Sequence, residues 1–358
     1  MQPLLTPYTL GNLELKNRVV MAPMTRSRTP DTVPNALNVL YYSQRASAGL
    51  IVAESTNINN YGIGGPFTPG IFSPEQAEGW KQVTAAVHER GGKIFLQLWH
   101  AGRVAHPDNI GGEQPVAPSP IKADGKAFTA AGLKEYVTPR ELSIAEIRTI
   151  IEEYRQAAVH AKLAGFDGVE LHAAFGYLPN QFLSDAANQR PDEYGGSVEN
   201  RTRFVLEVLD ALCSVWDSQR VGIRIAPSNV YNSVLDSNPP ALYGYLVEKL
   251  NALNLAYLSV MEAFVKEHPN PYFIYDVSGH FRPLYRGTLI TNGGINQTRG
   301  NFLIESGQAD LIAFGQLFIA NPDLVSRFAN EVELAVPDRS TFYGGDERGY
   351  TDYGAIKK

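Results

Sequence analysis

The stretch HAAFGYLPNQFLS, residues 172–184, places a histidine, a phenylalanine and a tyrosine directly after a short apolar run. An imidazole can polarise a carbonyl oxygen, and a phenol stays protonated near neutral pH yet can release its proton in a dry site. His172 and Tyr177 are therefore candidates for a proton-transfer reaction, whereas Phe175 between them offers no hydrogen-bonding group. Without further context the plainer alternative is a satisfied core histidine and a packing aromatic in a chain with 18 tyrosines.

Other polar residues stand within or at the ends of similar apolar runs. Gln97 and Arg224 interrupt segments that are otherwise apolar, and an amide with a guanidinium could hold the carbonyl groups and ring nitrogens of a heterocycle. A pair between Arg224 and a core carboxylate such as Glu170 is the alternative, which we favour less because phosphate-binding features point to the same place. Further candidates at such ends are Pro23, Met24, Thr25, Ser55, Thr56, Trp99 and His100.

Two glycine-containing segments, TNGGINQ (291–297) and AFGQLFIANPDL (313–324), have the composition of phosphate-binding loops. Glycine lets backbone amides approach an anion closely. Each segment alone is weak evidence, because ordinary turns also need glycine. Together, after adjacent strands, they favour a phosphate-bearing ligand, as loops seven and eight of barrels often bind one. The candidate residues are Asn292, Gly293, Gly294, Gly315 and Gln316.

Eight short runs of apolar and β-branched residues predict strands that are buried on both faces. They are residues 17–23, 49–55, 93–100, 168–173, 221–227, 255–261, 287–294 and 310–316. Amphipathic segments between them predict helices, one beginning at Ser73 with Pro74 and another at Ser143 with Glu146 as a capping box.

This alternation predicts an α/β fold, a (β/α)8 TIM barrel with its site at the carboxyl ends of the strands. A doubly wound sheet is the alternative architecture. A doubly wound sheet that binds a dinucleotide has a glycine-rich phosphate-binding motif after its first strand, and the segment APMTRSRTP contains no glycine.

The 358 residues are expected to form a single domain, 1–358. Within it, residues 101–142 are rich in Gly, Pro and Ala without helical period, so we expect a lid-like excursion after the third strand. The net charge of -6 argues against a nucleic-acid surface, and no apolar run is long enough to cross a bilayer. No histidines have metal-ligand spacing. A lone cysteine and the absence of a secretion signal favour a cytoplasmic protein.

The chain resembles the old yellow enzymes, which are flavin-dependent ene-reductases, over essentially its full length. The resemblance rests on DEYGGSVENRTRF (192–204), HAAFGYLPNQFLS just ahead of it, AFGQLFIANPDL and the C-terminal YTDY (350–353). It is supported by RVVMAPMTR, VAEST, SPEQ, LQLWHAGR and LITNGG. Thr25, where some members carry cysteine, is similar to the classical branch of the family.

The resemblance implies a noncovalent FMN in the barrel mouth. The backbones of Pro23, Met24 and Ser55, with Thr25, would then contact the N5 and O4 edge of the flavin. Gln97 would hold the pyrimidine ring and Arg224 the N1 and O2 region, where a cation stabilises the reduced flavin. The phosphate would lie on the two glycine segments, at Asn292, Gly293, Gly294, Gly315 and Gln316.

The implied reaction uses NADPH or NADH as reductant and a small-molecule alkene activated by a carbonyl or nitro group. The alkene takes a hydride at its β-carbon, Tyr177 protonates the α-carbon and His172 holds the substrate oxygen. The substrate pocket would include Thr25, Trp99, Phe175 and Tyr350. Neither a nucleic acid nor a membrane is expected as a partner, and the protein would be a monomer or a homodimer.

Two departures from the family pattern fall on the predicted site. Phe175 stands where Asn or His is usual, so one donor to a developing oxyanion is missing, which typically costs about 10²–10³ in rate. It is an engineered change, natural tuning, or a sign that the substrate anchors elsewhere; we favour the first because the neighbouring positions keep the family residues. Gln316 stands where Arg is usual, which predicts weaker FMN retention.

Two other functions stay open at this point. One is an FMN-binding barrel that Phe175 leaves with little ene-reductase turnover. A more remote one is a phosphosugar aldolase or isomerase barrel, which would need a lysine or paired carboxylates at the strand ends, and the sequence places none there.

Overall fold

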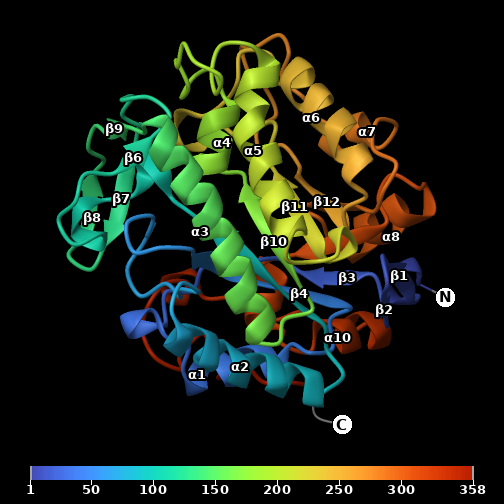
Figure 1. Cartoon of the computed structure of the whole chain (residues 1–358). Helices are drawn as coiled ribbons and strands as arrows, with labels where there is room; N and C mark the ends of the chain where they lie inside the picture. The colour runs from blue at the N-terminus through green and yellow to red at the C-terminus, as the bar shows by residue number, and fades with distance from the viewer. Residues whose placement is uncertain (1, 357–358) are drawn as a thin grey trace.

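The computed structural model describes residues 2–356; residues 1, 357 and 358, which the predicted domain also includes, lie outside the described part (Figure 1). Eight parallel strands close into a barrel, which confirms the predicted fold class. All eight overlap the predicted runs. In barrel order they are β3 (Val19–Met21), β4 (Leu50–Asn57), β5 (Ile94–Trp99), β10 (Gly168–Ala173), β11 (Val221–Ile225), β12 (Tyr257–Met261), β13 (Leu289–Asn292) and β14 (Leu311–Phe314).

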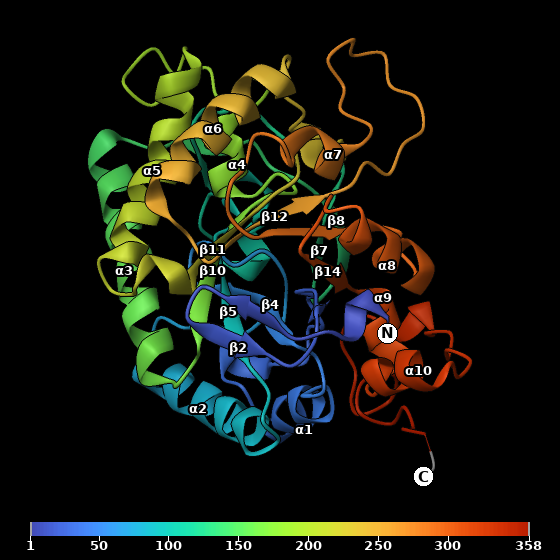
Figure 2. The same cartoon turned by 90° about the vertical axis from the view of Figure 1, so that its right-hand side faces the viewer.

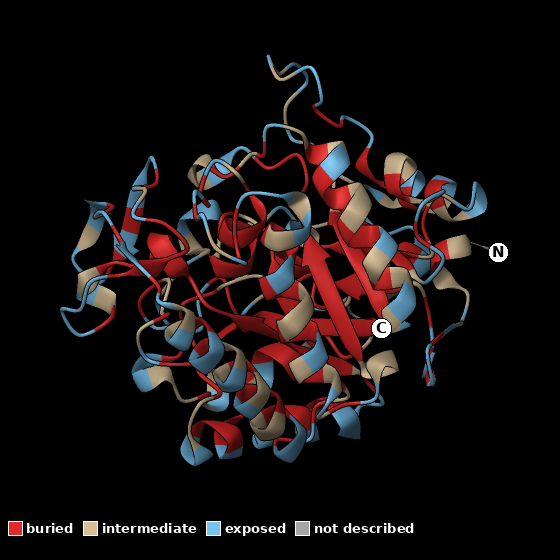
Figure 3. Cartoon of the chain, turned by 45° about the horizontal axis from the view of Figure 1, so that its top comes forward, coloured by how far each residue is buried: buried red, intermediate tan, exposed pale blue. Residues whose placement is uncertain are grey.

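The barrel strands are buried on both faces because their alternate side chains pack against different neighbours. On β3, Val19 and Met21 pack in the large cluster beneath the surrounding helices, whereas Val20 belongs to a smaller cluster with Phe95 and Tyr257 inside the barrel. The N-terminal hairpin of β1 (Tyr8–Leu10) and β2 (Leu13–Leu15) contributes leucines to that interior cluster. Figure 3 shows the buried strands surrounded by helices that expose only their outer faces.

Helices surround the barrel on its outer side (Figures 1 and 2). Their starts follow the predicted signals: Ser73 caps α2 and Ser143 caps α3, each with a complete capping box. The helices are α1 (Ala36–Gln44), α2 (Pro74–Glu89), α3 (Ile144–Leu163), α4 (Leu178–Leu183), α5 (Val198–Cys213), α6 (Pro239–Leu253), α7 (Val277–Phe281), α8 (Gln297–Glu305), α9 (Gln316–Ala320) and α10 (Leu324–Asn330).

Residues 101–142 leave the barrel between β5 and α3 and carry secondary structure that the sequence pattern does not indicate. An antiparallel hairpin joins β7 (Lys126–Thr129) to β8 (Gly132–Glu135), and β6 (Val116–Ala117) pairs in parallel with β9 (Arg140–Glu141). The hairpin projects at one side of the molecule in Figure 1. The short β6–β9 pair therefore closes the part of the excursion that contains the hairpin.

Within residues 2–356 the model contains no helix that is both long and apolar enough to cross a membrane. The same residues contain no group of three or more His, Cys, Asp and Glu side chains arranged to hold a metal ion.

Candidate active site

A cavity of about 990 Å³ lies at the carboxyl ends of the barrel strands. Its volume is at the upper end of the usual range for ligand-binding clefts. The structure brings almost every residue singled out from the sequence to the wall of this one cavity. These residues are Pro23, Met24, Thr25, Ser55, Gln97, Trp99, His172, Phe175, Tyr177, Arg224, Asn292, Gly293, Gly294, Gly315 and Gln316.

A chain of buried hydrogen bonds orients the amide of Gln97 at the bottom of the cavity. Ser55 Oγ donates to Gln97 Oε1 at 2.6 Å, and Gln97 Nε2 donates to Glu170 Oε1 at 2.7 Å. Tyr257 donates its hydroxyl to the other oxygen of Glu170 at 3.0 Å. A β-bulge between Ala53 and Thr56 shifts the register of β4 where Ser55 lies, a device that often re-aims side chains beside active sites.

Arg224 supplies a buried positive charge beside this chain. Its Nη2 donates to Asn292 Oδ1 at 2.9 Å, while Nη1 is buried without a hydrogen-bond partner. No ion pair within 4.0 Å joins it to Glu170 among the described residues, so the alternative of a direct Arg224–Glu170 pair is not what the structure shows. Burial raises the pKa of the Glu170 carboxyl, and the charge of Arg224 opposes that shift. A guanidinium with a free N–H calls for an acceptor on a ligand.

The two glycine segments form one side of the same cavity. Gly293 and Gly294 have φ values of 126° and 64°, which only glycine adopts readily. A Cβ added at Gly294 would meet nothing within 4 Å, so the backbone there lies open to the cavity. Gly315 and the exposed Gln316 lie alongside, after the neighbouring strand β14. This arrangement suits a phosphate held by backbone amides.

His172 and Tyr177 lie next to each other, with ring centroids 4.8 Å apart at an interplanar angle of 71°. Burial, with the nearby charge of Arg224, lowers the pKa of His172 well below its ordinary value, so the imidazole is neutral near pH 7. Burial raises the pKa of the Tyr177 phenol above its ordinary value, which keeps the phenol protonated. The ring of Trp99 packs edge-on against Tyr177 at 5.0 Å. The site therefore combines a neutral donor with a protonated acid.

Thr56, His100 and Tyr350 do not line this cavity, and the prediction that Tyr350 lines the substrate pocket was wrong. Tyr350 is fully buried outside the cavity wall, stacked on Tyr41 with 4.1 Å between the ring centroids. Asn38 Nδ2 donates to its hydroxyl at 3.0 Å, and the guanidinium of Arg28 lies 4.6 Å from its ring. Tyr343, earlier in the same C-terminal segment, lines the cavity instead.

Several cavity residues carry no signal that sequence reasoning could have used. Tyr343 precedes two glycines with positive φ, Gly344 and Gly345, which mark a turn but not a site. Its ring lies 6.2 Å from that of Phe128 in the hairpin. Other residues on the wall that the sequence did not indicate include Lys126, Leu133, Tyr136, Met261 and Phe264.

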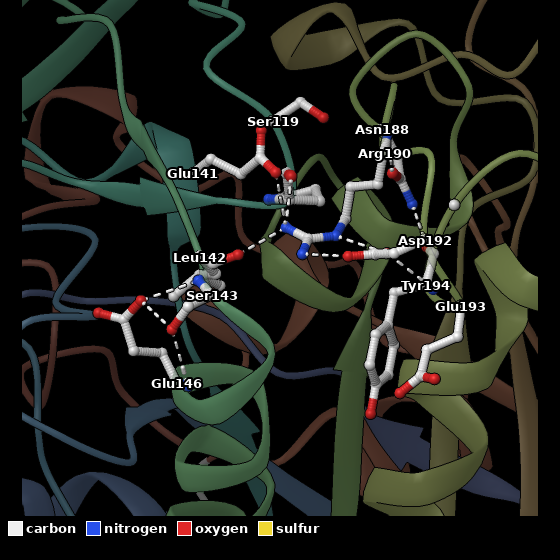
Figure 4. Close-up of polar contacts among 12 residues, drawn as sticks. Ser119, Glu141, Leu142, Ser143, Glu146, Asn188, Arg190, Asp192, Glu193 and Tyr194 are labelled. Atoms are coloured by element: carbon white, nitrogen blue, oxygen red, sulfur yellow. Dashed lines mark hydrogen bonds and ion pairs between the residues drawn. The ribbon is translucent and has the colours of Figure 1, made fainter.

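Arg190 ties the base of the excursion to the segment that follows α4 (Figure 4). Its Nη1 donates to the carbonyl oxygens of Pro118 at 3.0 Å and Leu142 at 2.6 Å, which directly follow β6 and β9. Its Nε and Nη2 form a two-pronged ion pair with Asp192. Since Arg190 itself is buried, these bonds are shielded from water and should hold the hairpin in place over the cavity.

We predict that Arg190→Met lowers the free energy of unfolding by about 3–5 kcal/mol, because it leaves the Asp192 carboxylate and buried carbonyls without their partner. Arg148→Met is the matched control. Arg148 is 71% exposed and forms a long ion pair of 4.0 Å with Glu193, so its replacement should lower the free energy of unfolding by about 0–1 kcal/mol. Urea unfolding of the two variants measures both values. Equal losses in the two variants would show that the buried contacts of Arg190 stabilise the fold no more than an exposed ion pair does.

Comparison with known proteins agrees with this geometry. Residues 3–335 match the NADH:flavin oxidoreductase / NADH oxidase family. The chain is 46% identical to 12-oxophytodienoate reductase 1 of Oryza sativa subsp. japonica over 356 residues, covering 98% of this chain and 92% of that protein.

Solved structures give the same result. A structure of morphinone reductase in complex with tetrahydroNAD is 48% identical with a TM-score of 0.93, covering 99% of this chain and 98% of that one. The old yellow enzyme homologue from Zymomonas mobilis is 40% identical with a TM-score of 0.95, covering 99% of each chain.

The chain belongs to the NADH:flavin oxidoreductase / NADH oxidase family, in which it is an old yellow enzyme. It is an FMN-dependent oxidoreductase with a reduced nicotinamide nucleotide as its reductant. The residues present fit FMN: the cavity is large enough, the buried N–H of Arg224 lacks a partner, and a positive-φ glycine pair leaves backbone amides open. The remote alternative of an aldolase or isomerase is therefore wrong.

Proposed function

We propose that this enzyme reduces the C=C bond of alkenes activated by a carbonyl or nitro group, at the expense of NADPH or NADH. The observation that carries the proposal is the neutral imidazole of His172 beside the protonated phenol of Tyr177 in the FMN-sized cavity. No Asp or Glu lies among the described residues of the cavity wall, and the one lysine there, Lys126, belongs to the hairpin. Of the phenols on the wall, Tyr177 is the one whose ring packs against His172, 4.8 Å away, and we assign it as the acid that protonates carbon.

In this proposal Gln97 and Arg224 hold the pyrimidine side of FMN. The amide of Gln97 is oriented by Ser55 and Glu170, and Arg224 is oriented by Asn292, so both groups are in place before the cofactor binds. Such preorganisation reduces the entropy lost on binding. The backbones of Pro23, Met24 and Ser55, with Thr25, would contact the N5 and O4 edge of the flavin. The phosphate lies on Asn292, Gly293, Gly294, Gly315 and Gln316.

When bound, FMN would supply the hydride-transfer chemistry between NAD(P)H and the β-carbon of the alkene. His172 donates a hydrogen bond to the activating oxygen, where negative charge develops as the π electrons move away from the β-carbon. Tyr177 supplies the proton to the α-carbon, so that the electron pair of the former π bond ends in the new C–H bond. The tyrosinate recovers a proton from solvent, and NAD(P)⁺ leaves as the oxidised product.

The purified protein tests this directly. It should be yellow, bleach on anaerobic addition of NADPH, and recolour when an activated alkene such as a cyclic enone, a nitroalkene or a maleimide is added. A colourless protein that does not take up added FMN would contradict the proposal, because the proposed reaction requires FMN. Bleaching without recolouring by any of the three alkenes would favour the second candidate, an FMN-binding barrel with little turnover, which the donor-free side chain of Phe175 makes reasonable.

A consequence for cofactor affinity concerns Gln316, an exposed amide on the phosphate side of the cavity. We expect Gln316→Arg to lower the dissociation constant of FMN about tenfold, because a charge-assisted hydrogen bond contributes about 1.5 kcal/mol or more. Fluorescence titration of FMN with the apoprotein measures it. Gln316→Met, which has similar length and no charge, is the control; an equal gain in both variants would rule out a phosphate contact.

A further inference from the structure

Few hydrogen-bond donors lie where a substrate oxygen could meet His172. Nδ1 of His172 is buried without a partner, and the side chain makes no hydrogen bond, so Nε2 is the ring nitrogen that remains to serve the cavity. The Nε1 of Trp99 is buried and unpartnered as well. The ring of Phe175 lies edge-on to the imidazole, 6.0 Å away, and fills the position from which a second donor could reach the same oxygen. Tyr177 is committed to the α-carbon.

Phe175 is held in this place by its backbone. Its φ of 57° lies in the left-handed region, which is a genuine outlier for a bulky side chain. Asn232 Nδ2 donates to the carbonyl oxygen of Phe175 at 2.8 Å, and a Cβ on Gly176 would come within 2.6 Å of the Cβ of Asn232. Asn232 is held in turn by Arg103, whose Nη2 donates to its carbonyl oxygen at 2.8 Å. The turn cannot move without breaking these contacts.

The ring of Phe175 also faces the buried charge of the site. The guanidinium carbon of Arg224 lies 5.5 Å from its centroid, a cation–π distance. This contact and the edge of His172 flank the ring on two sides and favour its position beside the imidazole. The imidazole N–H is then the main hydrogen-bonding support for the oxygen on which charge develops.

Resting on the proposed function, we propose that Phe175 makes the enzyme selective for strongly activated alkenes, namely nitroalkenes and maleimides, over cyclic enones with a single carbonyl. In a nitroalkene two oxygens share the developing charge, and in a maleimide a second carbonyl already withdraws electrons. Such substrates need little help from the protein. A simple enone places the charge on one oxygen and depends on donors, each of which typically changes the rate by about 10²–10³.

The experiment compares Phe175→Asn with Phe175→Leu, two side chains of nearly the same size and shape. Only Asn adds a donor, so the pair separates hydrogen bonding from the space that the ring vacates. Asn also tolerates the left-handed backbone better than Phe, so we expect this variant to fold. If Phe175→Asn does not fold, Phe175→His takes its place, because histidine also provides a donor and also tolerates the left-handed backbone. The reduced holoenzyme is mixed with cyclohexenone or with a nitroalkene, and the reoxidation rate of the flavin is followed.

We expect the parent enzyme to prefer the nitroalkene. In Phe175→Asn the cyclohexenone rate should rise about 10²-fold, which is the effect of one donor, while the nitroalkene rate changes much less. Phe175→Leu should keep the preference of the parent. Equal rate ratios in the Asn and Leu variants would overturn the inference and leave the ene-reductase function standing. Failure of every variant to reduce either alkene would instead overturn the proposed function itself.

Discussion

Tyr177→Phe is expected to slow the transfer from reduced enzyme to a cyclic enone by about 10²–10⁴-fold, the usual contribution of a positioned acid. Reduction of the flavin by NADPH should keep its rate, because oxidation of a nicotinamide ring requires no proton from the protein. The substitution removes one oxygen and leaves the ring that packs between His172 and Trp99. Stopped-flow measurement of the two half-reactions separates the effects.

Tyr136→Phe provides the matched control for this experiment. Tyr136 lines the same cavity from the end of the excursion, but its hydroxyl donates to Asn232 Oδ1 at 3.3 Å and has no part in the proposed proton transfer. The control should leave both half-reactions close to those of the parent. Equal slowing of flavin reduction and alkene reduction by Tyr177→Phe would contradict the role of a proton donor.

The same assignment predicts a flat pH profile. Because burial raises the pKa of Tyr177 above its ordinary value near 10, the phenol stays protonated between pH 6 and about 9. Burial lowers the pKa of His172, so the imidazole stays neutral over the same range. The limiting rate of the alkene half-reaction should therefore not change across it. A rate that falls as pH rises through 7 would show that a group of lower pKa supplies the proton.

The barrel could be predicted from the sequence because its strands are buried on both faces. Runs such as 93–100 and 221–227 are apolar along nearly their whole length, a local property that needs no knowledge of the partner strands. The hairpin of β7 and β8 gave no such signal, since β7 is only four residues long and has Phe128 at an exposed position and Thr129 at a buried one. Tertiary contacts decide whether so short a segment becomes a strand.

The site could be predicted where residues follow the ends of barrel strands, because topology alone brings those ends together. The prediction for Tyr350 failed because the position of this residue depends on long-range contacts. The buried side chains of Arg26 and Arg28 donate to carbonyl oxygens between residues 341 and 349 and bring that segment against the barrel, where Tyr350 stacks on Tyr41. Nothing in the local sequence YTDY reports a partner more than 300 positions away.

His172→Ala is expected to slow the alkene half-reaction about 10²–10³-fold for cyclohexenone, because the imidazole is the main donor to the oxygen on which charge develops. Flavin reduction should respond differently. Because NADPH must reach the flavin through the same cavity, we expect His172 to donate to the oxygen of its carboxamide as well. No negative charge develops on that oxygen during hydride release, so loss of the bond should weaken NADPH binding and leave the limiting rate much less affected. Stopped-flow titration with NADPH distinguishes the dissociation constant from the limiting rate.

The variant pattern for His172 and Tyr177 then follows from chemistry. Loss of the acid, Tyr177, should slow alkene reduction only. Loss of the donor, His172, should lower the rate of alkene reduction and weaken the binding of NADPH in the other half-reaction. Because His172 is only 4% exposed, the cavity left by Ala could admit water, which would partly replace the lost donor and bring the effect towards 10². His172→Phe, which fills the space without a donor, should therefore lie nearer 10³. If alkene reduction is as fast in His172→Phe as in the parent, the imidazole does not support the developing charge and the substrate oxygen must bind elsewhere in the cavity.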